Sequence, residues 1–125
     1  MGAKKILIVD DDPDIQTALA KRLEAHGFAC AAAESIEAGL KFLESETPRL
    51  IILDLSFQGA NGTAFLQNAN QHLPPGVPVP PILVLSCFND KDIVDYVLNF
   101  GAVGFISKPY DPKVLISTIQ DYLAS

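Results

Sequence analysis

The sequence has few cysteines and no long apolar run, and each shortage excludes a class of protein. Cys30 and Cys87 are the only cysteines, and they show neither a CxxC motif nor a histidine-paired spacing. This argues against a disulfide framework and against a zinc site. We expect two buried, free thiols in a reducing, cytoplasmic location. The longest aliphatic runs, such as 50–53, are far shorter than the roughly 18 residues of a membrane span, so we expect no membrane segment and no export signal.

Positive charge is scarce as well. The chain carries 9 basic and 15 acidic residues, a net charge of −6 at neutral pH. A surface of this sign repels phosphate backbones and anionic lipids. We therefore predict that this chain alone does not bind nucleic acid.

Apolar residues, by contrast, are plentiful. They make up 49% of the 125 residues, against 19% charged residues, which is too apolar for a disordered chain. This length suffices for one hydrophobic core but not for two. We predict a single domain over residues 1–125.

Short apolar runs alternate with segments of helical periodicity, a pattern typical of an α/β domain with a parallel sheet. The predicted strands are 6–9, 28–32, 50–53, 82–86 and 103–107. A helix is predicted after each strand. The apolar residues expected to face the sheet are Ile15, Ala18, Leu19 and Leu23; Ile36, Leu40 and Leu43; Phe65, Leu66 and Ala69; Ile93, Val94, Val97 and Leu98; and Leu115, Ile119, Tyr122 and Leu123.

Residues with special backbone preferences mark the ends of these helices. Predicted stops are Gly27 and Gly101, predicted N-caps are Ser35, Asn89 and Asp111, and a turn is predicted at Gly59, Asn61 and Gly62. Residues 74–81 (PPGVPVPP) hold five prolines, which lack the backbone donor that helices and central strands require. We interpret this segment as a stiff loop, in preference to a polyproline ligand.

Polar residues follow four of the five predicted strands. Asp10, Asp11 and Asp12 follow the first, Asp54 the third and Lys108 the fifth, whereas Ser86 ends the fourth. In an open parallel sheet, ligands bind beyond the carboxyl ends of the strands. We expect these side chains to meet at one edge.

The three consecutive aspartates have two different explanations. Asp12 precedes Pro13 and is a good N-cap with proline at the first helical position. Asp10 and Asp11 cannot both be caps, and carboxylates about 4 Å apart repel by on the order of 4 kcal/mol at an effective dielectric of about 20. If Asp54 joins them, a cation is needed, and hard oxygen ligands at an open site suit Mg²⁺.

Asp54 and Lys108 each have an ordinary explanation when taken alone. A strand-end aspartate often bonds to the amides of a turn, and most lysines are solvated at the surface. Together, a carboxylate, a divalent cation, a hydroxyl and an ammonium group at one edge can receive a phosphoryl group. The carboxylate attacks, and the positive groups stabilise the charge.

Four stretches carry a resemblance to a known family. "ILIVDDD", "LIILDLSFQGANG", "ILVLSC" and "GFISKPY" resemble the signature stretches of the bacterial two-component receiver domain, in family order and close to family spacing. The resemblance covers essentially the whole chain. It implies a single-domain, doubly wound, flavodoxin-like sheet of five parallel strands in the order 2-1-3-4-5, with helices on both faces.

The resemblance also implies roles for individual residues. Asp54 is implied to accept a phosphoryl group from a histidine kinase or histidine phosphotransfer protein. Asp10, Asp11, Asp54 and the main-chain carbonyl of Ser56 are implied to hold Mg²⁺. Lys108 is implied to pair with a phosphoryl oxygen and to precede a cis peptide bond with Pro109. The activity that the resemblance implies is a self-catalysed transfer and loss of the phosphoryl group, not that of a conventional enzyme.

Ser86 and Phe105 are implied to form the switch. Ser86 would bond to the phosphoryl group and vacate space, so that Phe105 turns inward and reshapes the surface of the fourth helix, fifth strand and fifth helix. That surface would bind a downstream protein, a fused effector domain or a second copy of the chain.

Two alternatives stay open at this point. A haloacid-dehalogenase-type phosphatase also uses an aspartate nucleophile, a lysine and Mg²⁺, although Pro13 and Asp14 stand where its motif continues to threonine. A receiver-like interaction module without phosphorylation is the other. Gln58 stands where the family often has proline, and Cys87 stands where a smaller alanine or glycine is usual. Phe88 comes next and could crowd the approach to Asp54 or shield it from water, which leaves the lifetime of the phosphoryl group open.

Overall fold

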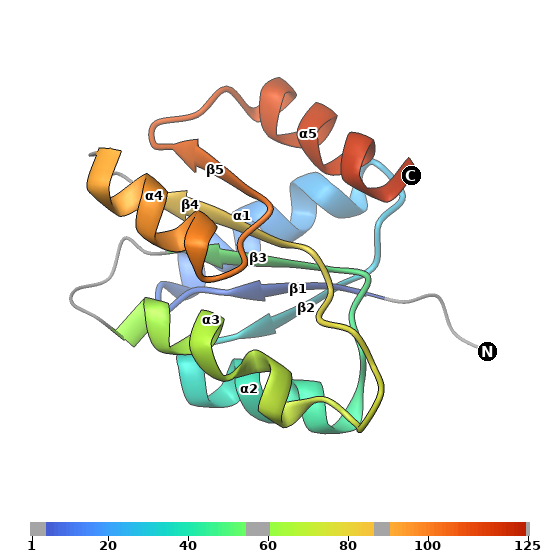
Figure 1. Ribbon diagram of the computed structural model, residues 1–125. Helices are drawn as coiled ribbons and strands as arrows, with labels where there is room; N and C mark the ends of the chain where they lie inside the picture. The colour runs from blue at the N-terminus through green and yellow to red at the C-terminus, as the bar shows by residue number, and fades with distance from the viewer. Residues whose placement is uncertain (1–4, 55–60, 87–90, 125) are drawn as a thin grey trace.

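The computed structural model describes residues 5–54, 61–86 and 91–124 of the chain (Figure 1). Five strands and five helices alternate: β1 (Ile6–Val9), α1 (Pro13–Glu24), β2 (Cys30–Ala33), α2 (Ile36–Ser45), β3 (Leu50–Asp54), α3 (Asn61–His72), β4 (Ile82–Ser86), α4 (Lys91–Asn99), β5 (Gly104–Ser107) and α5 (Pro112–Ala124). The strands form one parallel sheet in the order β2-β1-β3-β4-β5. The predicted fold and strand order are confirmed.

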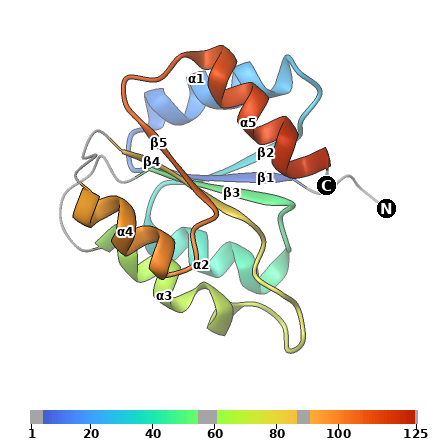
Figure 2. The same cartoon turned by 45° about the horizontal axis from the view of Figure 1, so that its top comes forward.

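Helices cover both faces of the sheet, as Figure 2 shows: α1 and α5 lie on one face, and α2, α3 and α4 on the other. Every residue of β1, β3 and β4 is buried, as expected for central strands of a parallel sheet. The protein has two hydrophobic cores, one on each face of the sheet, and successive side chains of β1 point into one and then the other. Leu7 and Val9 pack with α2, α3 and α4, whereas Ile6 and Ile8 pack with α1 and α5.

Three strand boundaries differ from the prediction. The second strand begins at Cys30 and not at residue 28, because its partner β1 begins at Ile6, which pairs with Cys30. The fifth begins at Gly104, although the amide of Val103 still donates to the carbonyl of Ile82 at 2.9 Å. The third extends by one residue to include Asp54.

The buried face of α1 differs from the predicted one. Leu19 and Leu23 are buried, but Ala18 is exposed and Gln16 is buried in its place. Positions 16, 19 and 23 follow the helical spacing of one face. The prediction for Ala18 is wrong because it selected the apolar residue over the polar one, whose amide finds partners inside the protein.

The buried face of α4 is also narrower than predicted. Val97 is fully buried and Ile93 and Val94 are half-buried, but Leu98 is 42% exposed. One residue further along the helix turns the side chain by about 100°. Leu98 therefore leaves the face that contacts the sheet, and the prediction for it is wrong.

The helix ends follow local chemistry. The Asp12 carboxylate accepts from the amide of Asp14 at 2.9 Å, Ser35 Oγ accepts from the amide of Ala38 at 3.0 Å, and Asp111 Oδ1 accepts from the amide of Lys113 at 2.9 Å. Gly27 and Gly101 have φ values of 89° and 106°, which favour glycine as predicted.

Several other predictions have mixed outcomes. Asn61 and Gly62 belong to α3, so the predicted turn at these two residues is wrong. Cys30 is free but only half-buried, because β2 is an edge strand. Asn89 and Cys87 lie outside the described residues. None of the described helices is long and apolar enough to cross a membrane.

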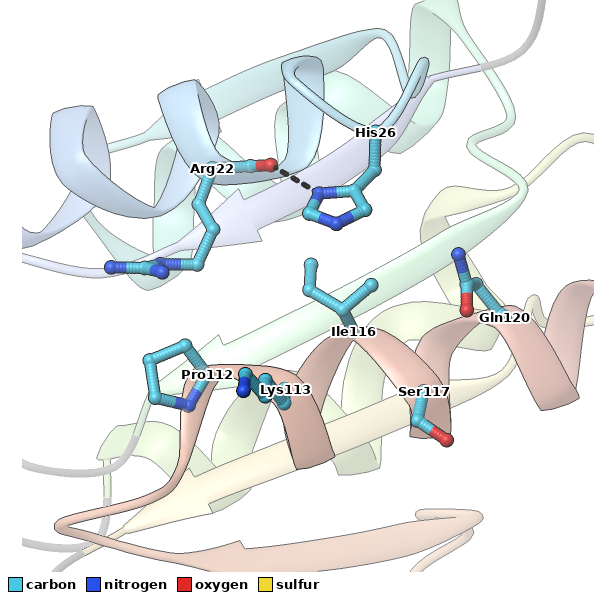
Figure 3. Close-up of a pocket in the computed structure, with 7 residues that line it drawn as sticks. All are labelled: Arg22, His26, Pro112, Lys113, Ile116, Ser117 and Gln120. Atoms are coloured by element: carbon cyan, nitrogen blue, oxygen red, sulfur yellow. Dashed lines mark hydrogen bonds between the residues drawn. The ribbon is translucent and has the colours of Figure 1, made fainter.

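A surface groove of about 340 Å³ runs between α1 and α5 (Figure 3). The His26 ring is held there because Nδ1 donates to the main-chain carbonyl of Arg22 at 3.0 Å. The groove is lined by Arg22, His26, Pro112, Lys113, Ile116, Ser117 and Gln120. Most of these residues are exposed, Gln120 among them, so the groove belongs to the surface and not to the core.

Candidate functional site

The polar residues that follow the strands come together at one edge of the sheet. Asp10 directly follows β1, Asp54 ends β3, Ser86 ends β4 and Lys108 directly follows β5. These four strands are neighbours and parallel, so their carboxyl ends lie on the same side of the molecule (Figure 1). The predicted convergence is confirmed for these four residues.

A buried ion pair joins two of them. The Lys108 ammonium donates a hydrogen bond to Asp54 Oδ2. Asp54 is only 1% exposed, and a buried carboxylate keeps its charge only when it is paired. The main-chain amide of Lys108 donates to the carbonyl of Ser86 at 2.8 Å, which places the lysine at the end of β4. The peptide bond between Lys108 and Pro109 is cis, as the resemblance implied.

Asp10 is equally buried but less well satisfied. Its Oδ1 accepts from the amide of Asp12 at 3.0 Å, whereas its buried Oδ2 has no hydrogen-bond partner among the described residues. Burial, together with the negative charge of Asp54, raises the pKa of Asp10 to about 7. The amide of Asp12 and the charge of Lys108 act in the opposite direction. The ionised form of Asp10 is therefore disfavoured, and an added positive charge would stabilise it.

These observations test whether a divalent ion fits the site. An unpartnered carboxylate oxygen beside a second buried carboxylate is the arrangement that a hard cation would satisfy. In the part of the chain that the structure describes, no three His, Cys, Asp or Glu side chains are gathered as a ready metal cluster. Mg²⁺ commonly uses one or two carboxylates and keeps several waters, so Asp10 and Asp54 meet its requirement.

Of the other two predicted ligands, the structure describes only Asp11. Asp11 is exposed and follows Asp10 at the rim of this edge, where a hydrated ion could reach it. Ser56 lies outside the described residues, as do Gln58 and Phe88. The metal assignment of all four residues, Asp10, Asp11, Asp54 and Ser56, stays a prediction.

Gln16 is a site residue that sequence reasoning missed. Its side-chain Nε2 donates to the main-chain carbonyls of Asp10 and Ala33, both at 2.6 Å, and the residue is 6% exposed. A glutamine in an amphipathic helix is normally assigned to the solvent face. The signal that could have found it is its spacing to Leu19 and Leu23, which places all three on one face.

The predicted switch residues lie on neighbouring strands, two register positions apart. Ser86 is fully buried and lies opposite Ser107, and Phe105 lies opposite Val84. Phe105 is half-buried and packs against the core that contains α2, α3 and α4. The role of Ser86 and Phe105 as a switch stays a prediction.

The sequence model of the response regulator receiver domain matches residues 6–120. The chain belongs to the response regulator receiver domain family. It is 30% identical to the phosphate regulon transcriptional regulatory protein PhoB of Pseudomonas aeruginosa over 98% of this chain and 53% of that protein. It is 32% identical to an uncharacterized 14.6 kDa protein in the sodA1 3' region of Leptolyngbya boryana, over 94% of this chain and 88% of that protein.

Solved structures agree with the receiver assignment. A CheY-like receiver domain protein of Methanospirillum hungatei superposes with a TM-score of 0.85 at 30% identity, over 98% of this chain and 95% of that one. Receiver domains belong to two-component signalling, and the phosphatase alternative is a different family. Because the chain spans about half of PhoB, the activity of that whole protein does not transfer to this receiver.

Proposed function

We propose that this receiver accepts a phosphoryl group on Asp54 from a histidine kinase or a histidine phosphotransfer protein, with the help of Mg²⁺. The observation that carries the proposal is the placement of Asp54. It is buried, paired with Lys108, and next to an Asp10 carboxylate that has an unpartnered oxygen. A nucleophile, a positive group for the phosphoryl oxygens and a site for a cation thus share one edge of the sheet.

The transfer uses groups of the chain itself. A carboxylate oxygen of Asp54 attacks phosphorus, a P–O bond forms, and the P–N bond to the donor imidazole breaks with its electron pair going to nitrogen. Lys108 moves its hydrogen bond from Asp54 to a phosphoryl oxygen and stabilises charge there. The Ser86 hydroxyl donates to another phosphoryl oxygen. Attack of water on phosphorus later releases phosphate.

Asp10, Asp11, Asp54 and the main-chain carbonyl of Ser56 would hold Mg²⁺. When bound, the ion supplies positive charge that offsets the carboxylates and the phosphoryl oxygens. Asp10 would contribute Oδ2, because its Oδ1 is already bonded to the amide of Asp12. The ordinary role of Asp12 is that of helix cap, so it is not a ligand.

The output is a change in a binding surface. Ser86 and Phe105 would relay modification of Asp54 to α4, β5 and α5. Large apolar side chains that support a binding role are exposed on or beside these elements, namely Tyr96, Leu98, Phe100, Val103 and Val114. The rings of Tyr96 and Phe100 pack against each other in a tilted arrangement, with centroids 4.5 Å apart and planes at 42°. The partner would be a downstream protein, a fused effector domain or a second copy of the chain.

The test is incubation with Mg²⁺ and a small acyl phosphate, followed by intact mass and by release of free phosphate. Wild type should gain one phosphoryl group and lose it slowly, Asp54→Asn should gain none, and the exposed control Asp121→Asn should match wild type. Absence of the adduct in wild type with every donor would favour an interaction module that is not phosphorylated.

A further inference from the structure

Gln16 links α1 to the ends of two strands. It lies four residues after the helix cap Asp12, and its amide group points back to the edge of the sheet where Asp10 lies. We infer that Gln16 is a positioning residue that fixes the main chain of Asp10 and thereby sets the affinity of the site for Mg²⁺. This inference rests on the proposed function.

The hydrogen bonds around Asp10 leave its main chain little freedom. The Gln16 Nε2 group donates to the carbonyl of Asp10 at 2.6 Å, and the amide of Asp10 donates to the carbonyl of Ala33 at 3.0 Å. Gln16 Nε2 also donates to that same Ala33 carbonyl at 2.6 Å. Gln16, Asp10 and Ala33 thus form a closed arrangement, and both main-chain polar groups of Asp10 are held.

A fixed main chain decides where the carboxylate points. Oδ1 of Asp10 is held by the amide of Asp12 at 3.0 Å, which leaves Oδ2 as the oxygen available for an ion. If the carbonyl of Asp10 lost its partner, it would have to turn to find another, since a buried carbonyl is rarely left unpaired. This rotation of the peptide group would move Oδ2 of Asp10. Partners that orient a ligand in this way typically change metal affinity by 10-fold to 100-fold.

The side-chain amide of Gln16 has two donors on one nitrogen, so it can hold both carbonyls at once, and because it is neutral it does so without burying charge. Gln16→Glu keeps the shape but places an acceptor where a donor is needed. Gln16→Met keeps the length and removes both hydrogen bonds. These two substitutions separate the donor role from simple filling of space.

The decisive experiment is calorimetric titration of Mg²⁺ into Gln16→Met, at a temperature where circular dichroism shows the variant fully folded. We expect its dissociation constant to be at least about 10-fold above that of wild type. Gln120→Met is the matched control, because Gln120 is an exposed glutamine in the α1–α5 groove (Figure 3). Ile119→Val, a mild truncation of a fully buried side chain, controls for lost stability. Both controls should bind Mg²⁺ as wild type does.

The outcomes separate this inference from the proposed function. If wild type and a less stable Gln16→Met bind Mg²⁺ equally tightly, the positioning role is overturned and the Mg²⁺ site is left intact. No binding by wild type would overturn the metal part of the proposed function itself, and this inference with it. If Gln16→Met does not fold, Gln16→Asn takes its place. The shorter amide cannot span both carbonyls, so its ¹³C carbonyl shift at Asp10 should differ from that of wild type, and an unchanged shift and affinity would overturn the inference.

Discussion

Lys108 donates a hydrogen bond to Asp54 Oδ2, although the two residues are 54 positions apart in the chain. The contact joins the end of β3 to the residue after β5, with β4 between them. Asp54 has almost no exposure to water, whereas the Lys108 side chain is 18% exposed. The carboxylate therefore depends on the lysine for the stability of its charge, and modification of Asp54 must disturb this pair.

Loss of Lys108 should destabilise the unmodified protein. In Lys108→Met the buried carboxylate of Asp54 loses the ammonium group of Lys108, and breaking a buried ion pair in this way costs on the order of 3 kcal/mol. The free energy of unfolding from urea titration at pH 8 measures the loss. Lys113→Met, at an exposed position, is the control and should be close to neutral. Addition of Asp54→Asn to Lys108→Met should recover most of the loss, and a failure to recover it would show that the two residues are not coupled.

The stability of the metal-free protein should fall as pH rises. Burial raises the pKa of Asp10 from about 3.8 to about 7, so the folded protein binds this proton more tightly than the unfolded chain does. The stabilising effect of the proton is full below about pH 4 and is lost as pH rises through about 7. Asp10→Asn, which stays neutral, should exceed wild type in stability at pH 8 by on the order of 2 kcal/mol.

Urea titrations in the presence of a chelator, at several pH values from 4 to 8, measure this difference. It should shrink toward zero at the acid end. Asp92→Asn, which removes an exposed carboxylate, should follow the wild-type profile throughout. A constant difference between Asp10→Asn and wild type at every pH would contradict the assigned cause.

Mg²⁺ should stabilise wild type against heat, since a ligand that binds only the folded state raises its stability by mass action. Asp11→Ala should show a much smaller shift in Tm at the same Mg²⁺ concentration. Asp14→Ala removes a nearby exposed carboxylate at the start of α1 and should respond as wild type does. Equal shifts in all three proteins would count against Asp11 as a ligand.

Cys30 should react slowly with alkylating reagents. Burial, aided by the negative charge of Glu24, raises the pKa of the thiol from 9.0 to about 11, and the thiolate is the reactive form. At pH 8 the folded protein should react about 100-fold more slowly with iodoacetamide than the urea-unfolded chain does. The measurement uses Cys87→Ser so that one thiol is followed. Equal rates in the folded and unfolded states would exclude the expected protection.

The sequence alone determined the class of fold because its two periodicities are clear. Fully apolar runs such as that of β3 require burial on both faces, and the glycine, serine and aspartate signals marked most helix ends. Strand order could not be read from periodicity, because the order depends on how the helices cross the sheet, and it came from the family resemblance. Ala18 and Leu98 were misplaced because an apolar side chain on a helix is not always the one that faces the sheet.

Within the site, charge was easier to predict than hydrogen bonding. Asp10, Asp54 and Lys108 were identifiable because ionisable groups directly after buried strands are costly to bury unless they are paired or bind a ligand. Gln16 was not, because its role depends on two main-chain carbonyls from different strands. No local pattern in the sequence brings those carbonyls together.

The most direct test of the central claim is the location of the phosphoryl group. After treatment with Mg²⁺ and an acyl phosphate, borohydride converts an aspartyl phosphate to homoserine, and mass spectrometry of the peptides identifies the position. The account predicts homoserine at position 54 in wild type and none in Asp54→Asn. Homoserine at another aspartate, or an equal yield of adduct in Asp54→Asn, would contradict it.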